Sequence, residues 1–191
     1  GGFGLQLALR LIEKFHPETL FLTSRCGIKN QYQRSIVEYI QKSGTQVVLI
    51  TQEETDFTHQ ESTNLFFQKY GQSIQGVFHL AGLLRDGFLK NVQEQEWDLV
   101  IETKVSAAVC LDQAMRQWCD PSTLFYVWSS VSAAFGNPGQ TSYAYANSSL
   151  GHLVSKRLTD CFHACSIQWG AVGDVGMLGT LSSETTLTVQ P

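Results

Sequence analysis

Four polar residues in the second half of the sequence have types and spacings that suit acid chemistry. Ser130 ends an apolar run of strand length, "STLFYVWSS" (122–130), and Tyr143 opens the next helical stretch. Asn147 lies one helical turn beyond Tyr143, so the two side chains share one face of that helix. Lys104 occurs upstream in "ETKVSAAVCL", amid small and apolar residues, where a charge needs a reason. Together they offer a phenol, a hydroxyl, an amide and an ammonium.

Each of these residues also has a purely structural interpretation. Ser130 could be a hydroxyl at a strand end and Tyr143 a helix cap or a core aromatic residue. A lone lysine such as Lys104 is most often a surface residue whose stem lies along apolar neighbours. Tyr145 falls off the face shared by Tyr143 and Asn147, so we expect it to be structural. The case for a reaction site therefore depends on the elements that bring the four residues together.

Those elements alternate between strands and helices. Continuous apolar runs without polar alternation are typical of strands buried on both faces. Such runs occur at 18–25, 45–51, 75–82, 122–130 and 163–170. Helices are expected between them at 4–15, 31–43, 58–70, 92–118 and 140–160. This alternation predicts an α/β fold with a Rossmann-type, doubly wound parallel sheet.

The opening residues "GGFG" are typical of a turn that binds a dinucleotide phosphate. Gly2, Phe3 and Gly4 would let the backbone approach a pyrophosphate at the start of a helix. The next predicted strand ends in Ser24 and Arg25, where NAD-binding sites carry a carboxylate for the ribose 2′-hydroxyl. A hydroxyl and a guanidinium suit a 2′-phosphate instead, so the expected cofactor is NADPH.

Several ordered motifs give the chain a specific resemblance. They are "GGFG", "LTSR-G", "GVFHLAGLLRDG", the helix with Lys104, "SSVS...GN-GQ--Y--AN" and "WGAVGDVG". The sequence closely resembles the ketoreductase domain of animal-type fatty acid synthases, which is related to the ketoreductases of modular polyketide synthases. Both belong to the short-chain dehydrogenase/reductase superfamily. Most members read Y-x-x-x-K on the catalytic helix. Here Asn147 takes the lysine position and Lys104 lies on the preceding helix, as in synthase ketoreductases.

The resemblance implies the chemistry of a 3-ketoacyl reductase. Tyr143 would donate a proton, Ser130 would bind the carbonyl oxygen, and Asn147 would orient Lys104 or hold a relay water. Lys104 would bind the nicotinamide ribose and lower the pKa of Tyr143. A free phenol titrates near ~10, so bringing the pKa to about 7 requires ~4 kcal/mol of phenolate stabilisation.

The resemblance also assigns residues to the cofactor. Ala81 and Gly82 would lie beside its ribose, and Gly170 would belong to the loop on the nicotinamide side. Glu53 falls where many relatives have an aspartate beside the adenine, a weaker correspondence. His79 is expected to be a packed residue rather than a catalyst.

Two further positions concern the stereochemistry of the product. Asp86 ends the acidic motif in "LLRDG", which resembles that of ketoreductases producing the D (3R) alcohol. Phe135 stands where the L-producing type has a tryptophan. We therefore expect a D-3-hydroxyacyl product.

The composition of the chain limits the kinds of molecule that it is expected to bind. The net charge of −4 does not favour nucleic acid, and the apolar runs are too short to span a membrane. "CFHAC" (161–165) is interpreted as a helix end entering a strand, with no metal site, and the five cysteines suit a cytoplasmic protein. The expected partners are a substrate tethered to acyl carrier protein, other domains of the same synthase chain and a second subunit in a homodimer.

The expected organisation is a catalytic domain over 1–176 and a lid or tail segment over 177–191. Because "GGFG" resembles the second half of a longer motif, we expect the first strand of the fold to be missing from this fragment. Three alternatives stay open at this point. They are a polyketide synthase ketoreductase, a non-catalytic ketoreductase-like domain that braces an active partner, and a free-standing oxidoreductase of small carbonyls.

Overall fold

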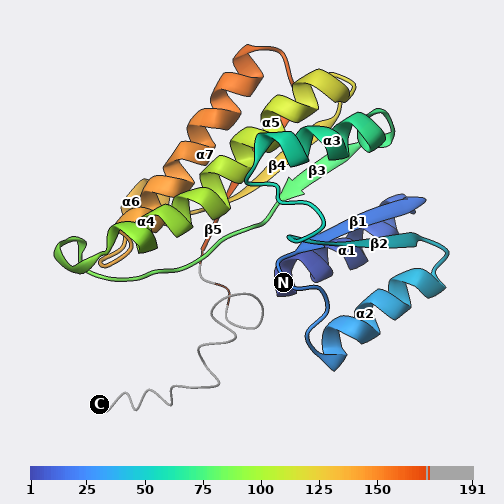
Figure 1. Ribbon diagram of the computed structural model, residues 1–191, viewed down its shortest axis with the longest axis horizontal. Helices are drawn as coiled ribbons and strands as arrows, with labels where there is room; N and C mark the ends of the chain where they lie inside the picture. The colour runs from blue at the N-terminus through green and yellow to red at the C-terminus, as the bar shows by residue number, and fades with distance from the viewer. Residues whose placement is uncertain (171, 173–191) are drawn as a thin grey trace. The chain divides into compact units, whose positions relative to one another are not determined.

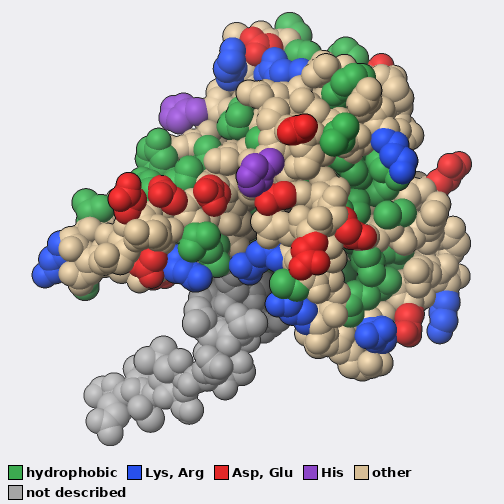
Figure 2. All heavy atoms as spheres, in the orientation of Figure 1, with side chains coloured by type: hydrophobic (Ala, Val, Ile, Leu, Met, Phe, Trp, Pro, Cys, Tyr) green, Lys and Arg blue, Asp and Glu red, His purple; other side chains and the backbone are tan. Residues whose placement is uncertain are grey.

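Two compact units make up the part of the chain that the structure describes. The structure is a computed structural model that describes residues 1–170 and 172 (Figure 1). One unit comprises residues 1–55 and the other residues 56–170. The expected lid or tail segment, 177–191, lies outside the described residues. Acidic and basic side chains are interspersed on the face drawn in Figure 2.

The first unit contains two helices and two parallel strands. In chain order they are α1 (Gly2–Phe15), β1 (Thr19–Ser24), α2 (Gln31–Lys42) and β2 (Gln46–Thr51). The two strands pair in register from Thr19 opposite Gln46 to Ser24 opposite Thr51. Its core is formed by apolar residues spaced three or four apart on the two helices, namely Leu5, Ala8, Ile12, Ile36, Val37 and Ile40.

The second unit has a three-stranded parallel sheet in the order β3-β4-β5. Its main elements are α3 (Gln60–Tyr70), β3 (Gly76–His79), α4 (Glu94–Ile101), α5 (Ala107–Trp118), β4 (Leu124–Ser130), α6 (Ser132–Phe135), α7 (Thr141–Thr159) and β5 (Ala164–Trp169). Short 3₁₀ turns occur at Gly71–Ser73 and Leu89–Asn91. α3, α5 and α7 lie over the same side of the sheet in Figure 1. Phe67, Met115, Phe125, Val127 and Leu150 form the core between these helices and β4.

The helix expected at 92–118 is continuous but not uniform. A π turn, Glu102–Ser106, separates α4 from α5. At its end, the N–H of Ala107 bonds to the carbonyl of Glu102, five residues back instead of four. π turns of this kind are rare and frequently occur at functional sites. Lys104 lies in the middle of this one.

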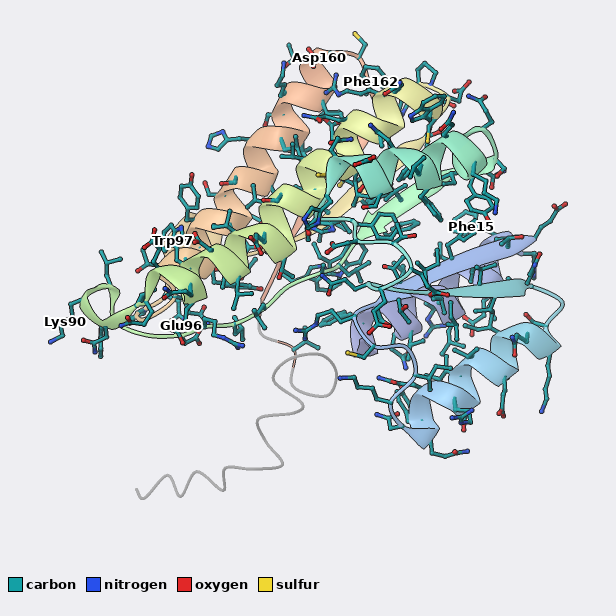
Figure 3. All side chains as sticks on the ribbon, in the orientation of Figure 1. Phe15, Lys90, Glu96, Trp97, Asp160 and Phe162 are labelled. Atoms are coloured by element: carbon teal, nitrogen blue, oxygen red, sulfur yellow. The ribbon has the colours of Figure 1, made fainter. Side chains whose placement is uncertain are left out.

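A buried ion pair connects α7 to α5, with a partly exposed pair beside it. The Arg157 side chain is 1% exposed and pairs with Asp112, which also accepts hydrogen bonds from Arg116. Arg116 pairs in addition with Asp160 at 2.9 Å. Figure 3 labels Asp160 and Phe162 at this end of the unit. Breaking a buried pair strands a charge without a partner, so these contacts hold α7 to the helix that continues from Lys104.

The predicted strands and helices are confirmed, with three local corrections. α1 already begins at Gly2, so the glycines lie in its first turn and not in a preceding loop. β3 ends at His79 rather than at residue 82, and the short helix α6 was not expected. Among the described residues, β1 pairs only with β2, and β3 pairs only with β4. The further strand expected beside them stays a prediction.

No helix in residues 1–170 is long and apolar enough to cross a membrane.

Candidate active site

Lys104, Ser130 and Asn147 surround Tyr143 in the second unit. Ser130 is the last residue of β4, and Tyr143 and Asn147 lie in the first two turns of α7. Asn147 Nδ2 donates to the main-chain carbonyl of Tyr143 at 2.8 Å, and the side chains of Asn147 and Ser130 both act to lower the pKa of the Tyr143 phenol. The Lys104 Nζ atom lies 5.6 Å from the centroid of the Tyr143 ring. Residues from the π turn, β4 and α7 therefore share one site.

Two main-chain carbonyls hold the Lys104 ammonium. Nζ donates to the carbonyl oxygen of Trp128 at 2.7 Å and to that of Ala81 at 3.4 Å. The side chain is buried, and burial lowers the pKa of Lys104 to about 8. An ammonium has three N–H donors, so these two bonds leave one for a ligand.

The backbone of Lys104 is also bound from outside its helix. Its carbonyl oxygen lies 2.8 Å from Nε2 of His79, the last residue of β3. His79 is itself buried, and burial, with the Lys104 charge, lowers its pKa to about 4. The imidazole is therefore neutral near pH 7, and because a carbonyl only accepts, Nε2 carries the proton. His79 is packed beside the site, as expected, but it also makes this specific bond.

The pKa of Tyr143 departs from our expectation. We expected Lys104 to lower it, whereas the pKa is raised, chiefly because burial disfavours the phenolate. Hydrogen bonds with Asn147 and Ser130 act in the opposite direction, and the negative charge of Asp86 raises the pKa further. The Lys104 ammonium is directed at carbonyls and at the ring face rather than at the hydroxyl, which explains why it does not overcome burial.

Asn147 is placed differently from the expected contact with Lys104. Its Nδ2 donates to the Tyr143 carbonyl at 2.8 Å, and its Oδ1 is buried without a hydrogen-bond partner in residues 1–170. The Ser129 hydroxyl donates to the Asn147 carbonyl at 3.1 Å and so fixes α7 against β4. An unpaired buried oxygen suits an ordered water, in line with the alternative role as holder of a relay water.

A pair of loops borders the site on the side of Asp86. Gln140 Nε2 donates to Asp86 Oδ2 at 2.9 Å, and the N–H of Gly87 donates to the Gly139 carbonyl at 2.8 Å. Gly139 has a φ of +78°, which a residue with a side chain rarely adopts. We call these two bonds the loop clasp. The Phe135 side chain, in contrast, is exposed to solvent (87%).

The loop clasp could not have been found from the sequence. Gln140 belongs to the motif "GN-GQ--Y--AN", but its bond to Asp86 depends on a contact between segments distant in the chain. The π turn around Lys104 likewise has no recognisable pattern in "ETKVSAAVCL".

The remaining candidate cofactor residues divide between the units. In the second unit, Ala81 supplies a carbonyl to Lys104 and Gly82 follows it. A Cβ added at Gly170 would meet no atom of the described part of the chain within 4 Å. In the first unit, Gly2, Phe3 and Gly4 form the first turn of α1, the end of a helix that attracts negative charge.

The other residues of the first unit lie at strand ends. The Ser24 hydroxyl accepts from the N–H of Gly27 at 2.8 Å, and Arg25 is exposed just after β1. Glu53 is exposed after β2, whereas its neighbour Glu54 accepts from the N–H of Thr51.

The donor set of the second unit fits a nicotinamide cofactor and a carbonyl substrate. Lys104 has an N–H donor left for a ribose hydroxyl, and Tyr143 and Ser130 place two hydroxyls side by side for one carbonyl oxygen. Ser130 ends β4 and Ala81 follows the end of β3, at the carboxyl ends of parallel strands where such folds bind ligands. Fold and site together define a Rossmann-type oxidoreductase of the short-chain dehydrogenase/reductase superfamily.

Comparison with known families makes the assignment specific. Residues 1–174 match the KR domain, and the chain belongs to this ketoreductase family. A naringenin synthase of Pestalotiopsis fici is 30% identical over 178 residues, which are 93% of this chain and 6% of that protein. The chain thus spans a small part of this relative's length. The relatives include polyketide synthases. The family match therefore identifies a ketoreductase domain but does not distinguish an animal-type fatty acid synthase from a polyketide synthase.

Solved ketoreductases have the same fold. The A-type ketoreductases of modular polyketide synthases superpose with a TM-score of 0.83 at 28% identity, over 93% of this chain and 37% of that one. A ketoreductase domain from the bacillaene assembly line gives a TM-score of 0.80 at 26% identity, over 93% and 43%. The Rossmann-type fold predicted from the sequence is therefore confirmed.

Proposed function

We propose that this domain reduces a 3-ketoacyl thioester carried by an acyl carrier protein to the 3-hydroxyacyl thioester, with NADPH as the reductant. The observation that supports this most is the cluster in which the buried Lys104 lies over the Tyr143 ring and the Ser130 side chain acts on the Tyr143 phenol. The cluster is built to receive negative charge on one oxygen.

The chain's residues act on that oxygen. NADPH, when bound, supplies the hydride that reduces the carbonyl carbon. Tyr143 gives its proton to the carbonyl oxygen, which becomes the hydroxyl, and Ser130 donates a hydrogen bond to the same oxygen. A preorganised donor of this kind contributes about 3–4 kcal/mol to barrier lowering in a dry site. The proton lost by Tyr143 is replaced from solvent through the buried Oδ1 side of Asn147, and the Lys104 ammonium stabilises the intervening phenolate.

Ser24 and Arg25 are proposed to select NADPH over NADH. A hydroxyl and an exposed guanidinium after β1 can bind a 2′-phosphate through charge-assisted hydrogen bonds. The backbone N–H groups of Gly2, Phe3 and Gly4, in the first turn of α1, would bind the pyrophosphate.

Four further residues complete the proposed cofactor contacts. Ala81, Gly82 and Gly170 would allow close approach of the nicotinamide and its ribose, and Glu53 would lie beside the adenine.

A D (3R) product is proposed from the loop that carries Asp86. The clasp with Gln140 gives that loop a defined position beside Tyr143, whose pKa responds to the Asp86 charge. The L-producing type has a tryptophan at the position of Phe135, and this chain lacks it.

The synthase context has two candidates. We propose a fatty acid synthase, on the combined resemblance of "GGFG", "GVFHLAGLLRDG" and "WGAVGDVG". A polyketide synthase is the second candidate, favoured by relatives such as the pikromycin synthase component PikAII of Streptomyces venezuelae, 29% identical over 185 residues. Either context implies further domains in the same chain. A homodimer and a cytoplasmic location belong to the proposed fatty acid synthase.

A direct assay tests the proposal. The intact protein is incubated with NADPH and a 3-ketoacyl thioester, and both NADPH oxidation and the 3-hydroxyacyl product are measured. We expect one hydroxyl product per NADPH consumed. Cofactor binding without any turnover would support the non-catalytic alternative instead. Products of the intact synthase, a saturated acyl chain or a polyketide, then distinguish the two contexts.

A further inference from the structure

The buried His79 ring makes a specific hydrogen bond to the backbone of Lys104, which suggests a role beyond packing. Nε2 is 2.8 Å from the carbonyl oxygen of Lys104, inside the π turn that carries the lysine. The bond joins the end of β3 to the helix in the interior of the unit, because the His79 and Lys104 side chains are both almost fully buried. The bond therefore links β3 of the sheet directly to Lys104 in the helix.

Lys104 is consequently fixed at both of its ends. His79 binds its backbone, while the carbonyls of Trp128 and Ala81 bind its ammonium. All three partners come from the carboxyl ends of β3 and β4. A long side chain loses rotamer freedom when it is held in this way, so firm attachment of its backbone matters for where Nζ lies.

A proton-transfer role for His79 does not agree with this geometry. Its only acid proton at neutral pH is the Nε2 proton, which is directed at a carbonyl oxygen. Burial also keeps the ring from taking a second proton, with a pKa of about 4. The imidazole is a fixed donor.

We infer that His79 is a positioning residue for Lys104: its Nε2–H bond to the Lys104 carbonyl holds the π turn so that Nζ reaches the Trp128 and Ala81 carbonyls over the Tyr143 ring. The inference rests on the proposed function only for its effect on catalysis. The placement of Lys104 itself can be measured without turnover.

The test compares two variants of the intact protein. In His79→Gln, the amide Nε2 can replace the imidazole donor, whereas His79→Leu has similar bulk and no donor. Competitive acylation by acetic anhydride at a series of pH values, read by mass spectrometry, gives the midpoint at which each lysine becomes reactive. The exposed Lys90 is the internal control.

The two variants should differ at Lys104 alone. We expect its midpoint near pH 8 in the wild type and in His79→Gln, and closer to the ordinary value of ~10.4 in His79→Leu. Lys90 should react alike in all three. An unchanged Lys104 midpoint in His79→Leu would overturn the inference, whatever the activity of the domain.

Catalysis supplies a second, separate comparison. Misplacement of a catalytic group by about 1 Å can cost about 100-fold, so His79→Leu should lower kcat by about 10- to 100-fold and His79→Gln should restore most of it. In a Lys104→Met background, His79→Leu should cause no further loss, because its effect passes through the lysine. An equal loss in both backgrounds would contradict the positioning role. Absence of turnover in the wild type would count against the proposed function, and the acylation test would still decide the role of His79.

Discussion

The Lys104 ammonium lies over the face of the Tyr143 ring, with Nζ 5.6 Å from the ring centroid. A cation in this position is attracted to the ring without a hydrogen bond to the hydroxyl. Because the ammonium also binds two carbonyls, it is anchored to the sheet and can stabilise charge that develops on the phenol. This arrangement differs from a lysine that only lowers the resting pKa of a tyrosine.

Removing the ammonium tests its role in the reaction. We expect Lys104→Met to lower kcat by about 100-fold or more, since proton transfer from a positioned acid typically contributes 10²–10⁴-fold. The fold should be retained, because methionine fills much of the same buried space. Steady-state kinetics give the comparison, with Lys90→Met on the exposed loop as the control (Figure 3). Equal losses in both variants would contradict a specific role for Lys104.

The charge of Asp86 should be visible in the pH profile. Asp86 raises the pKa of Tyr143, so Asp86→Asn should lower that pKa while Asn Oδ1 still accepts from Gln140. Tyr143 must be protonated to act as an acid, so the alkaline limb of kcat should move to lower pH.

Gln140→Leu provides the matched comparison for the loop clasp. It keeps the Asp86 charge and removes the bond, so the alkaline limb should stay in place while the stereochemical purity of the product falls. The pH dependence of kcat and chiral analysis of the product separate the two effects. A limb that moves in Gln140→Leu but not in Asp86→Asn would contradict this assignment.

Arg25 should determine the choice between the two nicotinamide cofactors. Charge-assisted hydrogen bonds contribute about 1.5–3 kcal/mol each, so Arg25→Ser should weaken NADPH binding by about 10- to 100-fold and leave NADH binding nearly unchanged. Fluorescence titration of both cofactors measures this, with the exposed Arg34→Ser on α2 as the control. If Arg25→Ser weakens both cofactors equally, Arg25 does not bind the 2′-phosphate.

Burial of His79 should make the protein sensitive to acid. Its pKa is lowered from 6.5 to about 4, so below about pH 6.5 the unfolded chain binds a proton that the folded chain does not. Stability is therefore lost as the pH falls from about 6.5 towards 4. Between pH 7 and pH 5 the free energy of unfolding should fall by about 2 kcal/mol from this residue alone.

Urea denaturation at the two pH values measures that loss. His79→Gln does not titrate and should show a smaller loss by about the same 2 kcal/mol. The same pH dependence in both proteins would show that His79 is not the group responsible.

Much of the fold followed from local patterns in the sequence. Apolar runs of strand length predicted the five strands of residues 1–170, and the helical spacing of Leu5, Ala8 and Ile12 predicted α1. These signals are strong because buried strands and amphipathic helices leave periodic patterns. The four residues of the candidate site were found because they occur in ordered motifs with fixed spacings.

Other features depend on contacts that no local pattern records. Lys104, in the π turn, bonds to His79 on β3, to Trp128 on β4 and to Ala81 just beyond β3. The direction of the Tyr143 pKa shift depends on how deeply its ring is buried, which no local sequence pattern measures. For the same reason, we expected a lowered pKa where burial raises it.

The central claim is that Tyr143 donates the proton in ketone reduction, and Tyr143→Phe tests it most directly. Phenylalanine keeps the ring under Lys104 and removes only the hydroxyl, so NADPH binding should persist. In a single-turnover experiment with NADPH and a 3-ketoacyl thioester, we expect the rate of NADPH oxidation to fall by about 10²–10⁴-fold relative to the wild type. Tyr145→Phe, whose exposed ring packs against Trp97 on α4, should react at the wild-type rate. A Tyr143→Phe protein that binds NADPH and reduces the ketone as fast as the wild type would contradict the account.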